Sequence, residues 1–489
     1  MARYILVIDE GTTSTRTIIF DEKMREVSSA RKKFNQYFPK PGWVEQDAEE
    51  IFEKVLESIK DALQKGKIDP KDILAIGITN QRETVVPFDR DSGKPLHNAV
   101  VWQCRRTTQL SEALKEQGME KAIHEKTGLF LDPYFSGTKI RWLLENVPEI
   151  NSKKTLFGTV DAFLVYKLSG GKSFKTDVTN ASRTLLFNIN NLQYDKELLH
   201  LFKVNEEMLP EVVESADIFG ITSGIDVLPD GIPIMGVMGD QQAALFGHGG
   251  VKKGIVKNTY GTGSFLLFNT GDKPQFFDKG ILTTIASKIK GKTQYAIEGS
   301  IFIVGALIDW LLDVGLLKSF DELSDILSNG IETDIYFVPA FTGLGAPHWD
   351  PYARGGIFGL TRGTKREDIV RGAIYSIALQ TEELLRFIKE KCPEVSEMRV
   401  DGGVAKNDYI MQLQSDMSNI KIMRPACKEA TAKGAALLAA IGAGVLREEE
   451  IENCFAVEKV FSPLCGNIER EVAYEKYLKA VERVKNWEK

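Results

Sequence analysis

A short turn near the start of the chain carries residue types that bind phosphate. Gly11 follows an apolar run at residues 5–8, and a second apolar run at 17–20 is predicted to pair with the first as a β-hairpin. The hydroxyl residues that follow the glycine are Thr12, Thr13 and Ser14. Glycine lets a ligand approach the backbone, and hydroxyls with free N–H groups can surround phosphate oxygens. An ordinary hairpin, with hydroxyls that satisfy their own turn, remains the alternative.

Two charged residues flank this turn. Asp9 ends the first run, which is continuous enough to be a strand buried on both faces. Its carboxylate oxygens suit Mg²⁺ or the waters that Mg²⁺ retains. Arg16, on the returning strand, could neutralise further phosphate charge. Together these residue types predict a site for a nucleotide phosphate with its metal ion.

A second copy of the hairpin lies in the other half of the chain. Residues 254–269 read GIVKNTYGTGSFLLFN, and the glycine, threonine and serine of the first turn align with Gly261, Thr262 and Ser264. A duplicated hairpin predicts two similar domains that face one another, each with a phosphate loop. This is the layout of ATPases of the actin and sugar-kinase kind. A Walker P-loop is excluded, because no G-x-x-x-x-G-K-[ST] occurs in the sequence.

Length and composition agree with a large two-domain protein. A chain of 489 residues is too long for one ordinary core, and we expect domains at 1–249 and 250–489. The net charge is −6 and the charged residues, 27% of the total, are scattered. Because no basic stripe is present, we expect no nucleic-acid partner.

The cysteines and the apolar stretches indicate the cellular compartment in which the protein is expected. The five cysteines show no C-x-x-C pair, so we expect reduced thiols in a cytoplasmic protein and no zinc. The first residues lead directly into a strand pattern, which argues against a signal peptide. The longest apolar stretch, at 435–446, is short and rich in alanine and glycine, so it predicts a packed helix and no membrane span.

Several polar residues of the first half stand at the predicted ends of strands. Arg82 and Glu83 lie at a bend between two apolar runs, where an irregular backbone could turn both toward one ligand. A surface pair beside a turn is the alternative. Trp102 could line a ligand or belong to the core, and Tyr134 precedes a helix that we expect Ser136 to cap.

Asp240 closes the first half at a Gly-Asp corner between a strand and a helix. An aspartate in this place is a good N-cap. It is also a carboxylate at the carboxyl end of a strand, where open α/β sheets bind their ligands. Both interpretations remain open on the residues alone.

In the second half, glycines again stand where backbone would have to come close to a ligand. Gly305 opens a predicted helix, and Gly402 and Gly403 form a turn between a strand and a helix. Asn407 is expected one turn into that helix. Since any connection between a strand and a helix may use glycine, an ordinary turn is the alternative for Gly402 and Gly403.

Specific strings spread over nearly the whole chain resemble the FGGY family of carbohydrate kinases and, within it, the members that act on glycerol. They are DEGTTSTR, GWVEQD, NQRET, VVWQCRR, DPYFSGTKIRWLLEN, GDQQAALFG, NTYGTG, FTGLGAPHWDPYARG and VDGGVAKN. The resemblance implies an α/β fold of two duplicated ribonuclease-H-like (actin-like ATPase) domains with a cleft between them. It implies phosphorylation of glycerol by ATP with Mg²⁺, in glycerol catabolism. We expect a homodimer or homotetramer.

The resemblance also implies roles for single residues. The glycerol-binding residues would be Arg82, Glu83, Tyr134, Asp240 and Gln241, with Trp102 and Phe265 lining the carbon side. The nucleotide-binding residues would be Thr12, Thr13, Ser14, Arg16, Thr262, Gly305, Gly403 and Asn407. Asp9 and Asp240 would approach Mg²⁺, and Asp240 would be the catalytic base.

Two other functions remain open. One is a kinase for another polyol or ketose, and the other is an actin-like or chaperone-like ATPase without a small acceptor. The hydroxyl-binding residue types at 80–83 and 239–242 argue against the second, because a mechanical ATPase does not need them.

The sequence also departs from the family pattern. Glu10 stands where a glutamine is usual and is expected to add negative charge beside the first phosphate loop. Asp309 replaces a glutamine that often approaches the nucleotide. Between Gly224 and Pro233 the chain lacks the Gly-Gly-Lys-Gly-Gly-Thr-Arg loop that binds fructose 1,6-bisphosphate in some relatives, so we expect no inhibition by that sugar.

Overall fold

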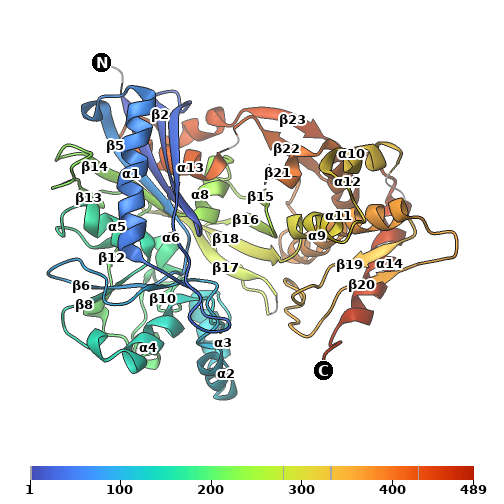
Figure 1. Ribbon diagram of the computed structural model, residues 1–489, viewed down its shortest axis with the longest axis horizontal. Helices are drawn as coiled ribbons and strands as arrows, with labels where there is room; N and C mark the ends of the chain where they lie inside the picture. The colour runs from blue at the N-terminus through green and yellow to red at the C-terminus, as the bar shows by residue number, and fades with distance from the viewer. Residues whose placement is uncertain (1–2, 279, 331–332, 428) are drawn as a thin grey trace.

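Two mixed β-sheets built on the same plan organise the chain (Figure 1). The computed structural model describes residues 3–278, 280–330, 333–427 and 429–489. The first sheet has the strand order β13 (Gly220–Ile221), β14 (Pro233–Gly239), β5 (Ile73–Asn80), β1 (Tyr4–Glu10), β2 (Ser14–Asp21) and β3 (Glu26–Lys33). The second has the order β17 (Leu282–Ile289), β18 (Lys292–Ile301), β16 (Ser264–Gly271), β15 (Ile255–Tyr260), β21 (Glu397–Gly402), β22 (Lys421–Pro425) and β23 (Val457–Phe461).

The two sheets repeat one connectivity. In the first, β1, β2 and β3 are antiparallel neighbours, while β5 pairs parallel to β1 and β14 pairs parallel to β5. In the second, β15, β16 and β18 take the antiparallel places and β21 and β22 the parallel ones. The predicted duplication of a ribonuclease-H-like unit is confirmed. The two predicted hairpins are the β1–β2 pair of the first sheet and the β15–β16 pair of the second.

The remaining elements are helices and short paired strands. The helices are α1 (Ala48–Gly66), α2 (Thr108–Glu116), α3 (Glu120–Thr127), α4 (Ser136–Asn146), α5 (Val160–Leu168), α6 (Val178–Ala181), α7 (Lys196–Leu201), α8 (Asp240–Gly247), α9 (Gly305–Asp313), α10 (Phe320–Ser328), α11 (Arg366–Lys391), α12 (Asp408–Ser418), α13 (Ala430–Gly442) and α14 (Asn467–Val484). The short strand pairs are β4 (Glu45–Gln46) with β7 (Ala99–Val100), β6 (Val86–Asp89) with β8 (Thr155–Gly158), β9 (Lys175–Asp177) with β12 (Glu211–Val213), β10 (Phe187–Asn188) with β11 (Gln193–Tyr194), and β19 (Tyr336–Val338) with β20 (Gly356–Phe358).

The first sheet is buried on both faces, as its continuous apolar strand predicts. Leu6 and Ile8 of β1 pack in a core with residues of α1 and α5, while Ile5 and Val7 pack on the opposite face with residues of α8 and α13. Side chains alternate between the faces of a strand, so an uninterrupted apolar run supplies both cores. The second sheet shares its own core with α9, α11, α12 and α14.

Helix α13 comes from the last quarter of the chain but covers the first sheet (Figure 1). Its buried residues are mostly alanines, and it lies so close to the strands that a Cβ added at Gly77 of β5 would be 2.5 Å from the carbonyl oxygen of Ala435. A Cβ at Gly434 would lie 1.9 Å from the carbonyl oxygen of Ala243 in α8. The predicted packed helix is therefore confirmed over 435–442, although α13 begins earlier, at Ala430, and ends at Gly442, so that 443–446 lie outside it; the helix joins the two halves. Among the residues that the structure describes, no helix is long and apolar enough to cross a membrane.

The close contact between α13 and α8 predicts that Gly434→Ala destabilises the protein. In a helix interior alanine is otherwise favoured over glycine by about 1 kcal/mol, whereas here the added methyl group forces the helices apart, at about 1–3 kcal/mol. We expect thermal unfolding to show an apparent Tm lowered by about 3 °C or more. Gly363→Ala is the matched control, because the nearest atom to its added Cβ is 3.8 Å away. An unchanged or raised Tm for Gly434→Ala would contradict the packing argument.

Candidate active site

The ends of three neighbouring strands bring the predicted residues of the first half together. Glu10 of β1 pairs with Asn80 of β5, and Asn80 pairs with Gly239 of β14. These strands end at one level, so the segments that follow them share one edge of the sheet. Parallel strands of α/β sheets bind ligands at this carboxyl edge. The turn at residues 11–14, here called the first phosphate turn, therefore lies next to the bend at Arg82 and the corner at Asp240.

The second sheet repeats this arrangement around a pocket. Tyr260 of β15 pairs with Gly402 of β21, and the turns that follow both strands line a pocket of about 510 Å³. Its lining includes all the second-half residues predicted to bind nucleotide, namely Thr262, Gly305, Gly403 and Asn407. Asp309, which stands in place of a family glutamine, lines the same pocket.

Asn407 does not lie where it was predicted to lie, and the position of Gly305 explains why a glycine is present there. Asn407 is the N-cap of α12, where its side chain accepts hydrogen bonds from the backbone N–H groups of Tyr409 and Ile410, so its predicted position one turn into the helix is wrong. Gly305 is the first residue of α9, and a Cβ there would lie 2.5 Å from the carbonyl oxygen of Gly261. Glycine is thus required for α9 to contact the second phosphate turn.

Arg82 and Glu83 are buried, so the alternative of a surface pair is wrong. The backbone bends after β5, and Glu83 has φ of +61°. Non-glycine residues rarely adopt this left-handed conformation, and its strain is common at functional sites. The irregular backbone is what allows adjacent side chains to reach one cluster.

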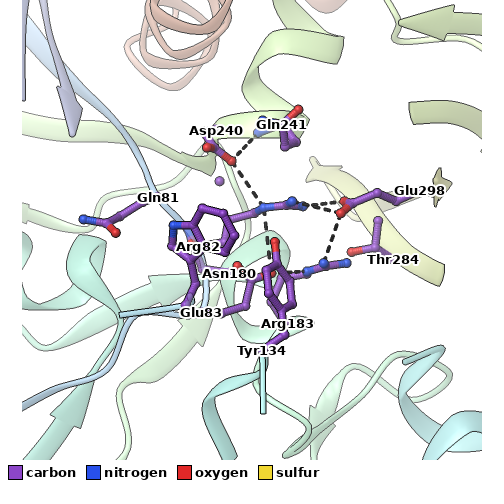
Figure 2. Close-up of polar contacts among 12 residues, drawn as sticks. Gln81, Arg82, Glu83, Tyr134, Asn180, Arg183, Asp240, Gln241, Thr284 and Glu298 are labelled. Carbon is purple, nitrogen blue, oxygen red and sulfur yellow. Dashed lines mark hydrogen bonds and ion pairs between the residues drawn. The ribbon is translucent and has the colours of Figure 1, made fainter. Parts of the chain in front are cut away.

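Four charged side chains form a buried ring in which the two signs alternate (Figure 2). Arg82 donates to both carboxylate oxygens of Glu298, at 2.6 and 3.0 Å. Arg183 donates to Glu298 at 3.2 Å and to Oε1 of Glu83 at 2.6 Å, and Nε of Arg82 lies 3.9 Å from the same Glu83 oxygen. Burial opposes ionisation of Glu298, but Arg183 and Arg82 outweigh it and lower its pKa to about 2. All four side chains are at most 2% exposed, so the charges are stabilised by one another.

Asp240 lies beside this ring (Figure 2). Its Oδ1 is 3.2 Å from Nε of Arg82 and accepts the backbone N–H of Gln241 at 2.7 Å. It is the first residue of α8, whose N-cap is Gly239, so the N-cap interpretation is wrong by one residue. Burial raises the pKa of Asp240, against the opposing effects of Arg82 and Lys257. Its side chain remains 33% exposed, which leaves it open to a ligand.

Gln241 is tied to the second half of the chain. Its Oε1 accepts a hydrogen bond of 2.6 Å from Nζ of Lys257, which lies on β15. Burial lowers the pKa of this lysine to about 8, while Asp401 and Asp240 oppose the shift. Lys257 also donates to the carbonyl oxygen of Phe265 at 3.4 Å. The strand that ends in the second phosphate turn therefore contacts the residue next to Asp240.

A buried lysine binds the backbone of two residues that are predicted to bind glycerol. Lys139 of α4 donates to the carbonyl oxygen of Glu83 at 3.3 Å and to that of Tyr134. Ser136 donates to the same Glu83 oxygen at 3.1 Å; the helix N-cap is Phe135, so the predicted capping role of Ser136 is wrong. The strained conformation of Glu83 is thus fixed through its carbonyl group.

Trp102 contacts both the first phosphate turn and one of the residues predicted to bind glycerol. Its indole N–H donates to the hydroxyl of Thr12 at 2.9 Å, and its ring packs edge-on against Tyr134 with centroids 5.5 Å apart. It is half-buried, so it is not a fully buried core residue. Ser14 accepts from Arg31 at 2.8 Å. The hydroxyls of Thr12 and Ser14 therefore bind other segments and do not satisfy their own turn.

Carboxylates gather beside the first turn. Asp9 and Arg16 face each other across the hairpin, with Oδ2 and Nη2 3.6 Å apart, and Arg16 also binds Glu429 at 2.5 Å. Burial raises the pKa of Asp9 to about 6, Arg16 opposes this, and the charge of Asp240 raises it further. Two carboxylates that repel each other at a phosphate turn fit Mg²⁺, which takes one or two carboxylates with phosphate oxygens and waters. Among the described residues, no group of three or more His, Cys, Asp or Glu side chains could hold a metal alone.

Glu10 behaves differently from its expected role as an added negative charge. It is fully buried, and its carboxyl group accepts a 3.2 Å hydrogen bond from the amide of Gln81. Burial raises the pKa of Glu10 well above its ordinary value, and the neighbouring charges of Asp9 and Asp240 add to the shift. This favours the uncharged acid, which resembles the family glutamine more closely than a carboxylate does.

Sequence reasoning did not identify several residues that hold the site in place. They are Lys139, Arg183, Gln242, Lys257 and Glu298. Arg183 lies in a turn with no recognisable chemistry, and Glu298 lies within a strand. No local pattern marks either residue, because their partners are 100 residues or more away in the chain.

Comparisons with known proteins identify the family to which the sequence is similar. Residues 4–247 match the N-terminal domain of the FGGY family of carbohydrate kinases, and residues 256–443 match its C-terminal domain. "Glycerol kinase 2" of Thermotoga maritima is 48% identical over 504 residues, covering 100% of both chains. "Glycerol kinase" of Lactobacillus acidophilus is 48% identical and covers 98% of this chain and 97% of its own length.

Solved structures share the fold. The crystal structure of Plasmodium falciparum glycerol kinase with ADP has a TM-score of 0.94 at 37% identity, with 99% of this chain and 98% of that chain covered. A xylulose kinase of Lactobacillus acidophilus, at 23% identity, has a TM-score of 0.89 with 98% of each chain covered, which shows the fold alone.

The burial of Lys139 predicts how stability depends on pH. Burial lowers its pKa from 10.5 to about 7, against the effect of Glu83. Between these values the unfolded chain binds a proton that the folded chain does not, so stability rises with pH across this window. Relative to Lys139→Met, the wild-type free energy of unfolding should gain about 2 kcal/mol between about pH 7 and about pH 9. Denaturant unfolding at both pH values measures the difference.

The control for this measurement is Lys167→Met. Lys167 lies on α5, and its ammonium binds Glu49 at 2.9 Å with a side chain 16% exposed. The comparison separates the effect of burying Lys139 from the effect of replacing any paired lysine by methionine. A gap between wild type and Lys139→Met that stays constant over the window would refute the assignment.

Proposed function

This chain belongs to the FGGY family of carbohydrate kinases, and we propose that the cluster around Arg82 and Asp240 is the site at which it phosphorylates glycerol. The reaction is the transfer of a phosphoryl group from ATP to glycerol, with sn-glycerol 3-phosphate and ADP as products. The observation that carries this function is 48% identity to glycerol kinases over essentially the whole chain. The buried polar cluster is the physical counterpart of a small acceptor rich in hydroxyl groups.

Recognition of glycerol has to come from hydrogen bonds. The molecule has six heavy atoms, and binding is limited to about −1.5 kcal/mol for each atom at best. Arg82 can donate to a hydroxyl, and Glu83 and Asp240 can accept from one. Tyr134 and Gln241 supply further polar groups beside them, and Trp102 and Phe265 line the carbon side. A site of this kind rejects acceptors that leave its buried groups unpaired.

Asp240 is the proposed base. Its carboxylate would accept the proton of the attacking hydroxyl, and the raised pKa makes it a stronger base than an exposed aspartate. Such proton transfer contributes about 10² to 10⁴ in rate. Arg82, 3.2 Å away, keeps the carboxylate oriented and favours its ionised form before the acceptor binds.

The nucleotide is proposed to lie between the two glycine turns. Thr262, Gly305, Gly403 and Asn407 line the pocket of the second half, and Thr12, Thr13, Ser14 and Arg16 form or flank the turn of the first half. Arg16 supplies positive charge, and the turn backbones can donate N–H groups to phosphate oxygens. Closure of the two halves over the site would exclude water, so that the acceptor hydroxyl and not water is phosphorylated.

Asp9 and Asp240 are the residues that would hold Mg²⁺. Burial is the main cause of the raised pKa of Asp9 and the charge of Asp240 adds to it, and a divalent cation bound between the two carboxylates would offset both effects. When bound, the ion neutralises developing charge on the transferred phosphoryl group.

Three further properties remain predictions. We propose domains at 1–249 and 250–489, which the break between the matched ranges, 4–247 and 256–443, supports. A cytoplasmic location is supported by the five free cysteines. A homodimer or homotetramer remains the expected assembly.

A panel of acceptors tests the function. ADP formation from ATP and Mg²⁺ should be fastest with glycerol, with kcat/KM about 10² or more above that for a ketose such as xylulose or a longer polyol such as ribitol. Faster turnover of xylulose or ribitol would assign the chain to another activity of the family. ADP formation that does not depend on any acceptor would indicate an ATPase without a small-molecule acceptor.

Asp240→Asn should keep ADP binding and lose about 10² to 10⁴ in kcat, because the amide cannot accept the proton. Calorimetry measures ADP affinity, and a coupled assay measures turnover with glycerol. Asp47→Asn is the control, since it makes the same change at the N-cap of α1, where asparagine caps equally well. Turnover of Asp240→Asn near that of the wild type would exclude Asp240 as the base.

A further inference from the structure

One carboxylate in the ring of charges comes from the other half of the chain. Glu298 lies on β18 in the second sheet, whereas Arg82, Arg183 and Glu83 all belong to the first 249 residues. Figure 2 shows its side chain reaching from the strand toward both guanidinium groups. It is 1% exposed, so its two oxygens are committed to contacts within the protein.

Glu298 fixes the orientation of Arg82. A guanidinium group is planar and has five N–H donors. Glu298 accepts one from Nη1 and one from Nη2, and Gln242 accepts the second from Nη1 at 3.1 Å. A bidentate pair of this kind sets the plane of the group as well as its position. The Nε edge consequently faces Asp240, and the second N–H of Nη2 is the donor that Glu298 and Gln242 leave unused.

The same carboxylate acts on Glu83 through Arg183. Arg183 donates through Nη2 to Glu298 and through Nε to Glu83, so it connects the two acids. Without Glu298, two arginines would lie next to each other with Glu83 as the one carboxylate of the ring. Glu83 would then be drawn toward both cations and away from the place where it could accept from a hydroxyl group.

Strand β18 also reaches the second phosphate turn. Three residues beyond Glu298, Ile301 pairs with Ser264, and a Cβ added at Gly263 would lie 2.5 Å from the carbonyl oxygen of Ile301. The strand that binds Arg82 thus supports the turn that lines the nucleotide pocket. The distance along an extended strand between the two contacts is about 10 Å.

We propose that Glu298 is a positioning residue of the second half that orients Arg82 directly, and Glu83 through Arg183, to bind the acceptor. The proposal rests on the proposed acceptor site. It means that the acceptor site is complete only when β18 is docked on the first half. A purely structural ion pair, which would affect folding and not acceptor binding, is the alternative.

The variant Glu298→Gln distinguishes a positioning role of Glu298 from a purely structural ion pair. The amide keeps the shape of the side chain but can accept through one oxygen only, so Arg82 loses its bidentate partner. We expect the KM for glycerol to rise about 10- to 100-fold, the range for a lost hydrogen bond to a charged group. Because the change acts through acceptor binding, kcat should fall less than KM rises. ADP affinity measured without glycerol should stay as in the wild type.

Glu382→Gln is the matched control, because Glu382 is also a buried glutamate of the second half paired with an arginine, Arg386, at 2.5 Å on α11. Its glycerol KM should equal that of the wild type. A Glu298→Gln enzyme whose glycerol KM is within about twofold of the control overturns the proposal. If the wild type itself shows no glycerol-dependent turnover, the proposed function fails instead.

A second variant decides the matter if Glu298→Gln does not fold, as judged by its loss of ADP binding. Arg183→Lys keeps the charge but removes the planar fork that bridges Glu298 and Glu83. We expect it to bind ADP normally and to show a glycerol KM raised about 10-fold or more. A glycerol KM for Arg183→Lys that matches the wild type would refute the bridging role and with it the proposal.

Discussion

Four buried charges beside Asp240 have to neutralise one another, and much of the arrangement around them follows from that requirement. Arg82, Arg183, Glu83 and Glu298 are almost completely buried. An isolated buried charge is strongly unfavourable, and breaking one member of a buried pair is costly. Since the fourth charge comes from β18, the cluster is neutral only when the two sheets are assembled.

Other contacts between the halves reinforce this assembly. Lys257 on β15 binds Gln241 beside Asp240, and α13 packs through alanines and glycines onto the first sheet. Each contact joins an element of the second half to an element of the first half that has one of its ends at the site. These contacts bring the cluster proposed to bind the acceptor, built on one sheet, together with the pocket proposed to bind the nucleotide, built on the other.

Burial shifts the ionisation of the site residues in different directions. It raises the pKa of Asp9 and Asp240, which repel each other, and it lowers that of Lys257. Glu298 is the exception among the acids, because two arginines outweigh its burial. Beside the first phosphate turn, where the proposed Mg²⁺ would be bound, Arg16 and Arg82 only partly offset the burial of Asp9 and Asp240. At Glu298, by contrast, the arginines fully offset the burial of the carboxylate.

The sequence by itself determined the duplicated hairpins, the doubly buried strands and the packed helix over 435–442, because each is encoded by local apolar pattern and glycine placement. Family strings also identified Arg82, Glu83 and Asp240 as candidates. Only the tertiary structure decided that Arg82 and Glu83 are buried, that Glu83 has a positive φ, and that Glu298 pairs with Arg82 across 216 residues of chain. The spacing of apolar residues along the sequence indicates which face of an element is buried, whereas the partner of a buried charge depends on how distant elements pack.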